Sequence, residues 1–164
     1  MKIIGLMFIA LLLATGVYVW KTEIGDDEIF ILPESYRGAV YIFYDQKNGE
    51  PVKYEQGKRV YEIPPNGILK TQFSLNTGWH SPDKYFYKEN GKLIQIPYLF
   101  DDRDLDAKRN IESKVHVCCP SSGKSYRDDG NGFVVFGQFY VGTNEEIHEA
   151  SEKGERINPI DLLN

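Results

Sequence analysis

The side chains best suited to chemistry lie close together in one short segment of the chain. His116, Cys118 and Cys119 offer one imidazole and two thiols, which are groups that bind Zn²⁺ in proteins. Side chains alternate along a strand, so His116 and Cys118 would share one face. A zinc site needs three or four protein ligands, and the remaining histidines, His80 and His148, are distant in the sequence. We therefore predict no catalytic, cofactor-binding or metal residue. His116, Cys118 and Cys119 are the candidates if a metal ion is bound.

The two cysteines are neighbours in the chain, and three arrangements are open to them. They can remain free thiols, join each other in a disulfide, or pair with a cysteine of another chain. Neighbouring Cα atoms lie about 3.8 Å apart, which is less than most disulfides span, so we expect two thiols packed on a core strand. Alternation predicts that Cys119 faces the core together with Val115 and Val117. Cys118 then lies on the opposite face.

A second motif, Gly123-Lys124-Ser125, resembles the end of a phosphate-binding loop. The complete motif needs a glycine five residues before Gly123, where this chain has Cys118, and a helix must follow it. The next residues, 126–130, are typical of a loop. We expect a polar loop between two strands at this point and no bound nucleotide.

Composition and charge describe the domain that positions these groups. The chain has 164 residues, of which 41% are hydrophobic and 13% aromatic, enough for one domain with a buried core. Aromatic residues favour strands. With 19 basic and 24 acidic residues the net charge is −5, which argues against nucleic acid as a partner because that partner requires a basic surface.

Short apolar runs separated by turn signals are typical of an antiparallel β domain. We predict strands near Glu28–Leu32, Ala39–Tyr44, Lys58–Ile63, Ile68–Phe73, Lys84–Lys88, Lys92–Ile96, Lys114–Cys119 and Gly132–Val141. The predicted fold is all-β, an antiparallel two-sheet sandwich by analogy with transthyretin-like or immunoglobulin-like domains. A small open barrel is the alternative.

Helical segments are predicted at both ends of the chain. Thr143 and Glu146 have the spacing of a capping box, which predicts a short C-terminal helix ending near Gly154.

Ala39–Tyr44 and much of Gly132–Val141 are apolar on both faces, so these strands belong in the centre of a sheet or beneath a helix. We expect the C-terminal tail to dock onto the domain through Ile160, Leu162 and Leu163.

The N-terminal 20 residues predict export or membrane attachment. Residues 3–20 carry no charge, and as a hydrophobic helix they would measure about 27 Å, close to the hydrocarbon thickness of a bilayer. Either the segment stays as a single-pass anchor in the cell membrane, or a signal peptide is cleaved near Gly16 and the domain is secreted. No cysteine lies near its end, which argues against a lipoprotein anchor.

Charge around this segment predicts its orientation and the domain boundaries. Lys2 precedes it and Glu23, Asp26 and Asp27 follow it, so we expect the N-terminus inside the cell and the domain outside. The predicted organisation is a signal anchor or signal peptide over residues 1–20, a linker over 21–27, and an extracytoplasmic β domain over 28–164.

Five motifs are shared with a known group of proteins: Phe30–Gly38, Gly57–Thr71, Gly78-Trp79, Tyr85–Tyr87 and Phe139–Thr143. Through them the chain resembles an uncharacterised bacterial family of exported or membrane-anchored domains, family 6843 among the domains of unknown function. The resemblance covers about residues 28–147. It implies strands and turns, and it supplies no catalytic residue.

These observations predict an extracytoplasmic β-sandwich domain of the bacterial envelope, with a structural or interaction role and no enzymatic activity. Its expected partners are the membrane, through residues 3–20, and an envelope protein or a glycan. The alternative is an envelope hydrolase or metal-binding protein centred on His116, Cys118 and Cys119. Aromatic side chains offer a glycan platform if they are exposed, and otherwise fill the core; they are Trp79, Tyr85, Tyr87 and Tyr98.

Overall fold

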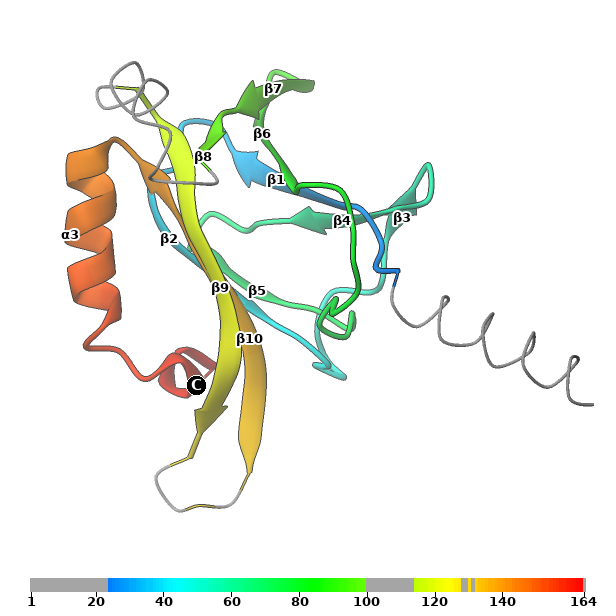
Figure 1. Cartoon of the computed structure of the whole chain (residues 1–164), viewed down its shortest axis with the longest axis vertical. Helices are drawn as coiled ribbons and strands as arrows, with labels where there is room; N and C mark the ends of the chain where they lie inside the picture. The colour runs from blue at the N-terminus through cyan, green and yellow to red at the C-terminus, as the bar shows by residue number, and fades with distance from the viewer. Residues whose placement is uncertain (1–23, 100–113, 128–129, 131, 164) are drawn as a thin grey trace, which may run out of the picture.

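A computed structural model describes residues 24–99, 114–127, 130 and 132–163. Two five-stranded sheets pack against each other, and one α-helix lies beside the second sheet (Figure 1). The first sheet contains, in spatial order, β3 (Tyr54–Glu55), β4 (Lys58–Glu62), β1 (Glu28–Pro33), β6 (Lys84–Glu89) and β7 (Lys92–Ile96). The second contains β5 (Ile68–Lys70), β2 (Gly38–Phe43), β10 (Phe133–Gly142), β9 (His116–Tyr126) and β8 (Tyr98–Leu99). The helical elements described are α3 (Asn144–Gly154) and the 3-10 helix η1 (Pro159–Leu163).

The predicted two-sheet β fold is confirmed, but the predicted antiparallel pairing is wrong because both sheets are mixed. β1 runs parallel to β4 and to β6, β2 runs parallel to β5, and β8 runs parallel to β9. Directly after β1, a turn with positive φ at Ser35 and Gly38 leads the chain into the other sheet. β4 and β6, which come later in the chain, run in the same direction as β1, whereas the edge strands β3 and β7 run antiparallel to their neighbours.

The strand positions agree with the sequence except in the polar segments. β9 continues to Tyr126, through the residues expected to form a loop, because its second half pairs with β10 from Gln138↔Ser121 to Phe133↔Tyr126. The short strands β3 and β8 were not predicted, since two paired residues leave no periodic pattern in a sequence. β5 ends at Lys70 rather than at Phe73.

A stack of three aromatic rings lies at the centre of the first sheet. Phe30 of β1 is in register with Tyr61 of β4 and with Tyr85 of β6. Its ring stacks on both, with centroids 4.8 Å and 5.1 Å away and interplanar angles of 8° and 15°. Phe139 of β10 meets the Phe30 ring edge-on at 5.5 Å, which joins the stack to the second sheet.

α3 covers the second sheet, as the two-faced apolar strands predicted. It packs on β2 and β10, which occupy central positions, and it buries Ile147. The predicted capping box is confirmed: Glu146 donates its backbone N–H to Thr143 Oγ1 at 3.4 Å, and Thr143 donates its own to Glu146 Oε2 at 2.8 Å. In the tail, Ile160 is buried, as expected, and its backbone N–H donates to Ser125 Oγ at 3.2 Å.

The first described residues are bonded to the loop before β6. Ile24 forms a parallel bridge with Trp79, and Gly25 donates its N–H to the Trp79 carbonyl at 2.8 Å. Asp26 pairs with Arg59 of β4, with Oδ2 and Nε 2.8 Å apart. Among the residues that the structure describes, no helix is long and apolar enough to cross a bilayer. The predicted segment over residues 1–20 and the first part of the predicted linker lie outside the described residues.

We expect Phe30→Ala to destabilise the domain by about 3–5 kcal/mol, because it removes the central ring of the stack and leaves a cavity between the sheets. Ile94→Ala is the matched control, since Ile94 is 46% exposed and its loss opens no buried cavity. Urea denaturation followed by circular dichroism measures both variants. Equal losses of stability in the two variants would contradict a central role for the stack.

Asp26 predicts an acid dependence of stability. The hydrogen bond from Arg59 is the main cause that lowers the pKa of Asp26 from its ordinary value of 3.8. The folded state therefore favours the ionised carboxylate; its contribution is present above pH 3.8 and is lost as the pH falls through the lowered value. Asp26→Asn is expected to be less stable than wild type near neutral pH, and the difference closes in strong acid.

Urea denaturation at a series of pH values checks this expectation. The control is Asp161→Asn, which removes an exposed carboxylate of η1. A deficit of Asp26→Asn that stays constant down to pH 2 would show that the contact does not depend on ionisation.

Candidate functional site

The structure joins the two cysteines to each other and separates them from His116. Cys118 and Cys119 form a disulfide, and no free cysteine remains. His116 is 1% exposed. Its buried ring is hydrogen-bonded through Nδ1 to the Lys114 carbonyl oxygen, 3.0 Å away. A disulfide supplies no thiolate, the form of cysteine that binds zinc or attacks a carbonyl group. The three candidate residues therefore do not form a common ligand set in this structure.

A β-bulge explains why the predicted orientation of the cysteines is wrong. Tyr140 pairs with Cys118 and Gln138 pairs with Ser121, so two residues of β9, Cys119 and the proline after it, lie opposite one residue of β10. Cys119 has φ +60°, and a proline is tolerated at a bulge because it needs no N–H for the ladder. The bulge interrupts the alternation, so Cys119 is exposed and Cys118 is half-buried, the reverse of the expected order.

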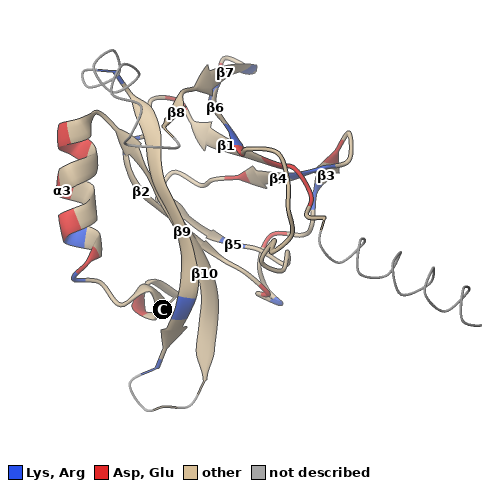
Figure 2. Ribbon diagram, viewed as in Figure 1, with Lys and Arg blue, Asp and Glu red and all other residues tan. Residues whose placement is uncertain are grey.

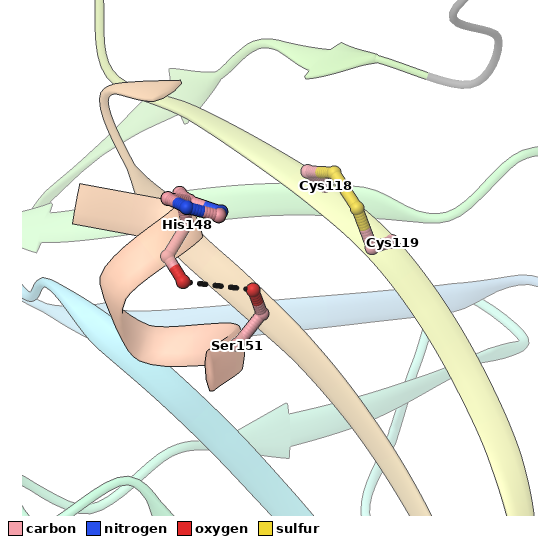
Figure 3. The surroundings of a disulfide bond; sticks show 4 residues. All are labelled: Cys118, Cys119, His148 and Ser151. Carbon is pink, nitrogen blue, oxygen red and sulfur yellow. Dashed lines mark hydrogen bonds between the residues drawn. A yellow bond between two sulfur atoms is a disulfide. The ribbon is translucent and has the colours of Figure 1, made fainter. Parts of the chain in front are cut away.

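The disulfide lies on the side of β9 near α3, as Figure 3 shows. The figure also shows His148 and Ser151 of α3, where Ser151 Oγ donates a hydrogen bond to the His148 carbonyl oxygen at 2.9 Å. His148 also lies 3.6 Å from Glu152 Oε1, on an exposed face of the helix. Gly123–Ser125 lie within β9, so this segment is a strand and has no resemblance to a phosphate-binding loop in three dimensions.

A different set of titratable groups converges at the edge of the inter-sheet space. Glu28 at the start of β1 and the residues His80 and Asp83 before β6 each bring a ligand atom within 4.8 Å of the others. Glu28 is only 7% exposed, and the Asp83 side chain is 18% exposed. His80 Nδ1 lies 3.5 Å from Asp83 Oδ1. One imidazole and two carboxylates make this cluster, the Glu28–His80–Asp83 cluster, the group best able to hold a cation.

Burial dominates the electrostatics of the two carboxylates. Desolvation raises the pKa of Glu28, and the nearby charge of Asp83 adds to the rise, while the hydrogen bond from Tyr61 opposes it. Desolvation also raises the pKa of Asp83, and the positive potential of His80 and a hydrogen bond from Tyr85 oppose that rise. Two carboxylates in a poorly solvated place favour a proton or a cation over two free negative charges.

Two cavities adjoin the cluster. A cavity of about 180 Å³ between the sheets is lined by all three residues together with polar side chains of β9 and β10, among them Ser122 and Gln138. A second cavity of about 340 Å³ is lined by His80 and Asp83 and by Trp79, which is 84% exposed. The cluster thus lies in the wall between an interior space and the protein surface.

The sequence held weak signals for this cluster. Glu28 alternates in phase with Phe30 and Leu32, so period two places a carboxylate on the inner face of β1. His80 and Asp83 are separated by three positions, a common spacing for two ligands on one turn of chain. Nothing in the sequence indicates that the two segments, about fifty residues apart, meet.

The four aromatic residues considered for a glycan platform are divided between core and surface. Tyr85 and Tyr87 are buried, at 1% and 8% exposure, so they fill the core. Trp79 is exposed, and Tyr98 is half-buried beside it in the surface cavity. The four aromatic residues therefore form no single flat surface.

Comparison with known proteins confirms the resemblance seen in the sequence. The model of the Family of unknown function (DUF6843) matches residues 25–151. The crystal structure of a putative lipoprotein from Bacillus anthracis is similar, with a TM-score of 0.52 and 19% sequence identity over 74% of this chain and 72% of that chain. No curated protein matches the chain. At this identity the likeness concerns the fold, and it assigns no role to any residue of the cluster.

The disulfide predicts a pattern of thiol labelling and a small energetic effect. The unreduced, unfolded chain is expected to react with no thiol reagent, and the reduced chain at two positions. Cys118→Ala/Cys119→Ala is expected to cost about 1 kcal/mol or less, because a bond between neighbours closes almost no loop and so removes little entropy from the unfolded chain. Urea denaturation measures the cost. Two reactive thiols before reduction would contradict the disulfide.

Proposed function

The chain belongs to the Family of unknown function (DUF6843), and we propose that it forms an extracytoplasmic β domain, which residues 3–20 attach to the outer face of a bacterial cell membrane. The domain acts as a structural or interaction module of the envelope and not as an enzyme. The similar protein from Bacillus anthracis, described as a putative lipoprotein, supports a place at the membrane. In this chain an uncharged apolar segment takes the part that a lipid-bearing cysteine plays in lipoproteins.

The observation that carries the proposal is the position of Trp79 beside the first described residue. Ile24 and Trp79 are paired, and their exposed fractions are 53% and 84%. Only residues 21–23 separate Ile24 from the apolar segment, and four residue steps of extended chain span at most about 14 Å. If the apolar segment crosses the bilayer, Ile24 and Trp79 lie within reach of the interface, where tryptophan side chains are enriched.

The distribution of charge supports the same orientation. α3 carries four glutamates and lies at the left of Figure 1, whereas the described chain begins at the right. Figure 2 shows these acidic residues along α3, on the opposite side of the molecule from β3 and β4. An acidic surface is repelled by anionic lipid headgroups. The acidic residues Asp26 and Asp27 at the Ile24–Trp79 end are paired with Arg59 and Lys58, so this arrangement favours that end as the membrane-proximal one.

An interaction role has a strand edge available to it. β7 is at the edge of the first sheet, where it pairs with β6. Four of its five residues are exposed, including Leu93 and Ile94 at 48% and 46%. An edge with exposed apolar side chains is suited to the addition of a partner's strand, so we place the contact with an envelope protein at β7.

Fractionation of bacteria that express the full chain with a C-terminal tag tests the attachment. We expect the chain in the membrane fraction, resistant to carbonate extraction, with its domain digested by protease added outside the cytoplasmic membrane. Ile9→Arg/Leu12→Arg is expected to abolish membrane attachment, because each arginine costs roughly 2.5–3.5 kcal/mol in the centre of a bilayer. The control Ile157→Arg adds charge at an exposed site of the domain and is expected to leave attachment unchanged.

The mass of the recovered chain separates the two fates of the segment. A mass that includes residues 1–20 supports an anchor. A chain that begins near Val17 and is found in the medium would show that the segment is a cleaved signal peptide and that the domain is secreted. A domain protected from external protease in spheroplasts, and digested only after lysis, would refute the extracytoplasmic location.

A further inference from the structure

We propose that Glu28, His80 and Asp83 bind a divalent transition-metal ion of the Zn²⁺ class, at the edge of the space between the two sheets. The donor set is one imidazole nitrogen and two carboxylate oxygens. Ca²⁺ and Mg²⁺ select sites made of oxygen atoms, whereas imidazole combined with carboxylate suits zinc and its neighbours in the first transition row. The inference concerns a site that the proposed envelope role does not require.

The three donor atoms are already close to coordination distance. They lie within 4.8 Å of one another without an ion. A tetrahedral zinc ion with bonds of about 2.0–2.2 Å places its ligand atoms roughly 3.4 Å apart. The required contraction is of the order of one ångström. Side-chain rotation can supply it, because His80 and Asp83 lie in the segment before β6 rather than within a paired strand.

Each of the three ligands is held by a partner that engages one of its two polar atoms. Tyr61 donates its hydroxyl to Glu28 Oε1 at 2.8 Å, and Tyr85 donates to Asp83 Oδ2 at 3.3 Å. His80 Nδ1 lies 2.8 Å from the Ser81 carbonyl oxygen; in the tautomer that donates to this carbonyl, Nδ1 carries the proton and Nε2 holds the lone pair that binds the metal. Metal ligands in proteins are oriented by this kind of outer hydrogen bond.

One oxygen of the cluster has no hydrogen-bond donor. Asp83 Oδ1 is buried and receives no hydrogen bond from any described residue. A buried carboxylate oxygen without a donor is costly, and here the nearby Glu28 is buried as well. A cation between the two carboxylates would satisfy the oxygen and neutralise the charge. An ordinary structural pair would have a lysine or arginine in that place.

The cavities give the ion a route and an open coordination position. The surface cavity lined by Trp79, His80 and Asp83 connects the cluster to the exterior. The interior cavity of about 180 Å³ lies on the other side and is lined by Glu28 as well. Three protein ligands leave at least one position for water or a small ligand, as in zinc sites that are not purely structural.

Calorimetric titration of the purified full chain in detergent, stripped of metal, with ZnCl₂ tests the proposal. We expect one Zn²⁺ per chain, and no comparable binding of Ca²⁺ or Mg²⁺. His80→Gln and Asp83→Asn are expected to weaken Zn²⁺ binding at least tenfold. Tyr85→Phe removes only the outer hydrogen bond and is expected to weaken it by about tenfold or more. His148→Gln is the matched control, because His148 also lies beside a carboxylate, Glu152, but on an exposed helix face.

Two further measurements do not depend on the loss of binding in a variant. Trp20→Phe leaves Trp79 as the only tryptophan, and Zn²⁺ is expected to change its fluorescence because it is the residue next to His80. Zn²⁺ at a hundredfold excess over Kd is expected to raise Tm by roughly 5–10 °C in wild type and in His148→Gln. In the metal-free state Asp83→Asn is expected to melt no lower than wild type, which shows that it is folded.

Several results would overturn the proposal. These are no stoichiometric Zn²⁺ binding by wild type, binding that survives both His80→Gln and Asp83→Asn, binding that is lost in His148→Gln, or Ca²⁺ binding as strong as that of Zn²⁺. The titration uses purified protein, so its outcome is independent of whether residues 3–20 anchor the chain.

Discussion

The stack of Tyr61, Phe30 and Tyr85 is the interaction on which the rest of the structure depends. Parallel pairing of β1 with β4 and β6 places the three rings opposite one another on the inner face of the first sheet. Their face-to-face packing fills the core, and Phe139 closes it from the second sheet. Because the outer two rings are tyrosines, their hydroxyl groups extend beyond the apolar core and reach Glu28 and Asp83. The residues that hold the sheets together thus also orient the polar cluster.

Placing two carboxylates at the end of this stack has an electrostatic cost. Desolvation raises the pKa of both Glu28 and Asp83, and burial likewise raises the pKa of Tyr61 and Tyr85, which keeps their hydroxyl groups protonated as donors. Nearby, Asp26 and Asp27 are neutralised by Arg59 and Lys58. The cluster has no such cationic partner beyond His80 among the described residues. At this end of the domain, the surface carboxylates thus have basic partners, whereas the two carboxylates of the cluster have the arrangement proposed to bind a cation.

β9 shows how a polar segment becomes a strand. Its second half has a proline, three serines, a glycine and a lysine before the final tyrosine, yet the backbone of β10 pairs with it from Ser121 to Tyr126. Ser125 is buried because η1 covers it, with its hydroxyl shared between Asn158 and the Ile160 N–H. The bulge at Cys119 absorbs the residue that does not match β10, and the disulfide lies on that bulge. Pairing with a long apolar neighbour outweighed local turn propensity here.

Local patterns in the sequence determined the elements, and the tertiary structure decided how they combine. The capping box of Thr143 and Glu146 acts over a few residues, so the sequence alone predicts it. The apolar runs of β2 and β10 likewise predict strands covered on both faces. The parallel partners of β1, the register shift that turned Cys119 outward, and the meeting of Glu28 with His80 and Asp83 depend on contacts between segments tens of residues apart. Alternation along one strand carries no information about its neighbour, so only the assembled sheets could bring these groups together.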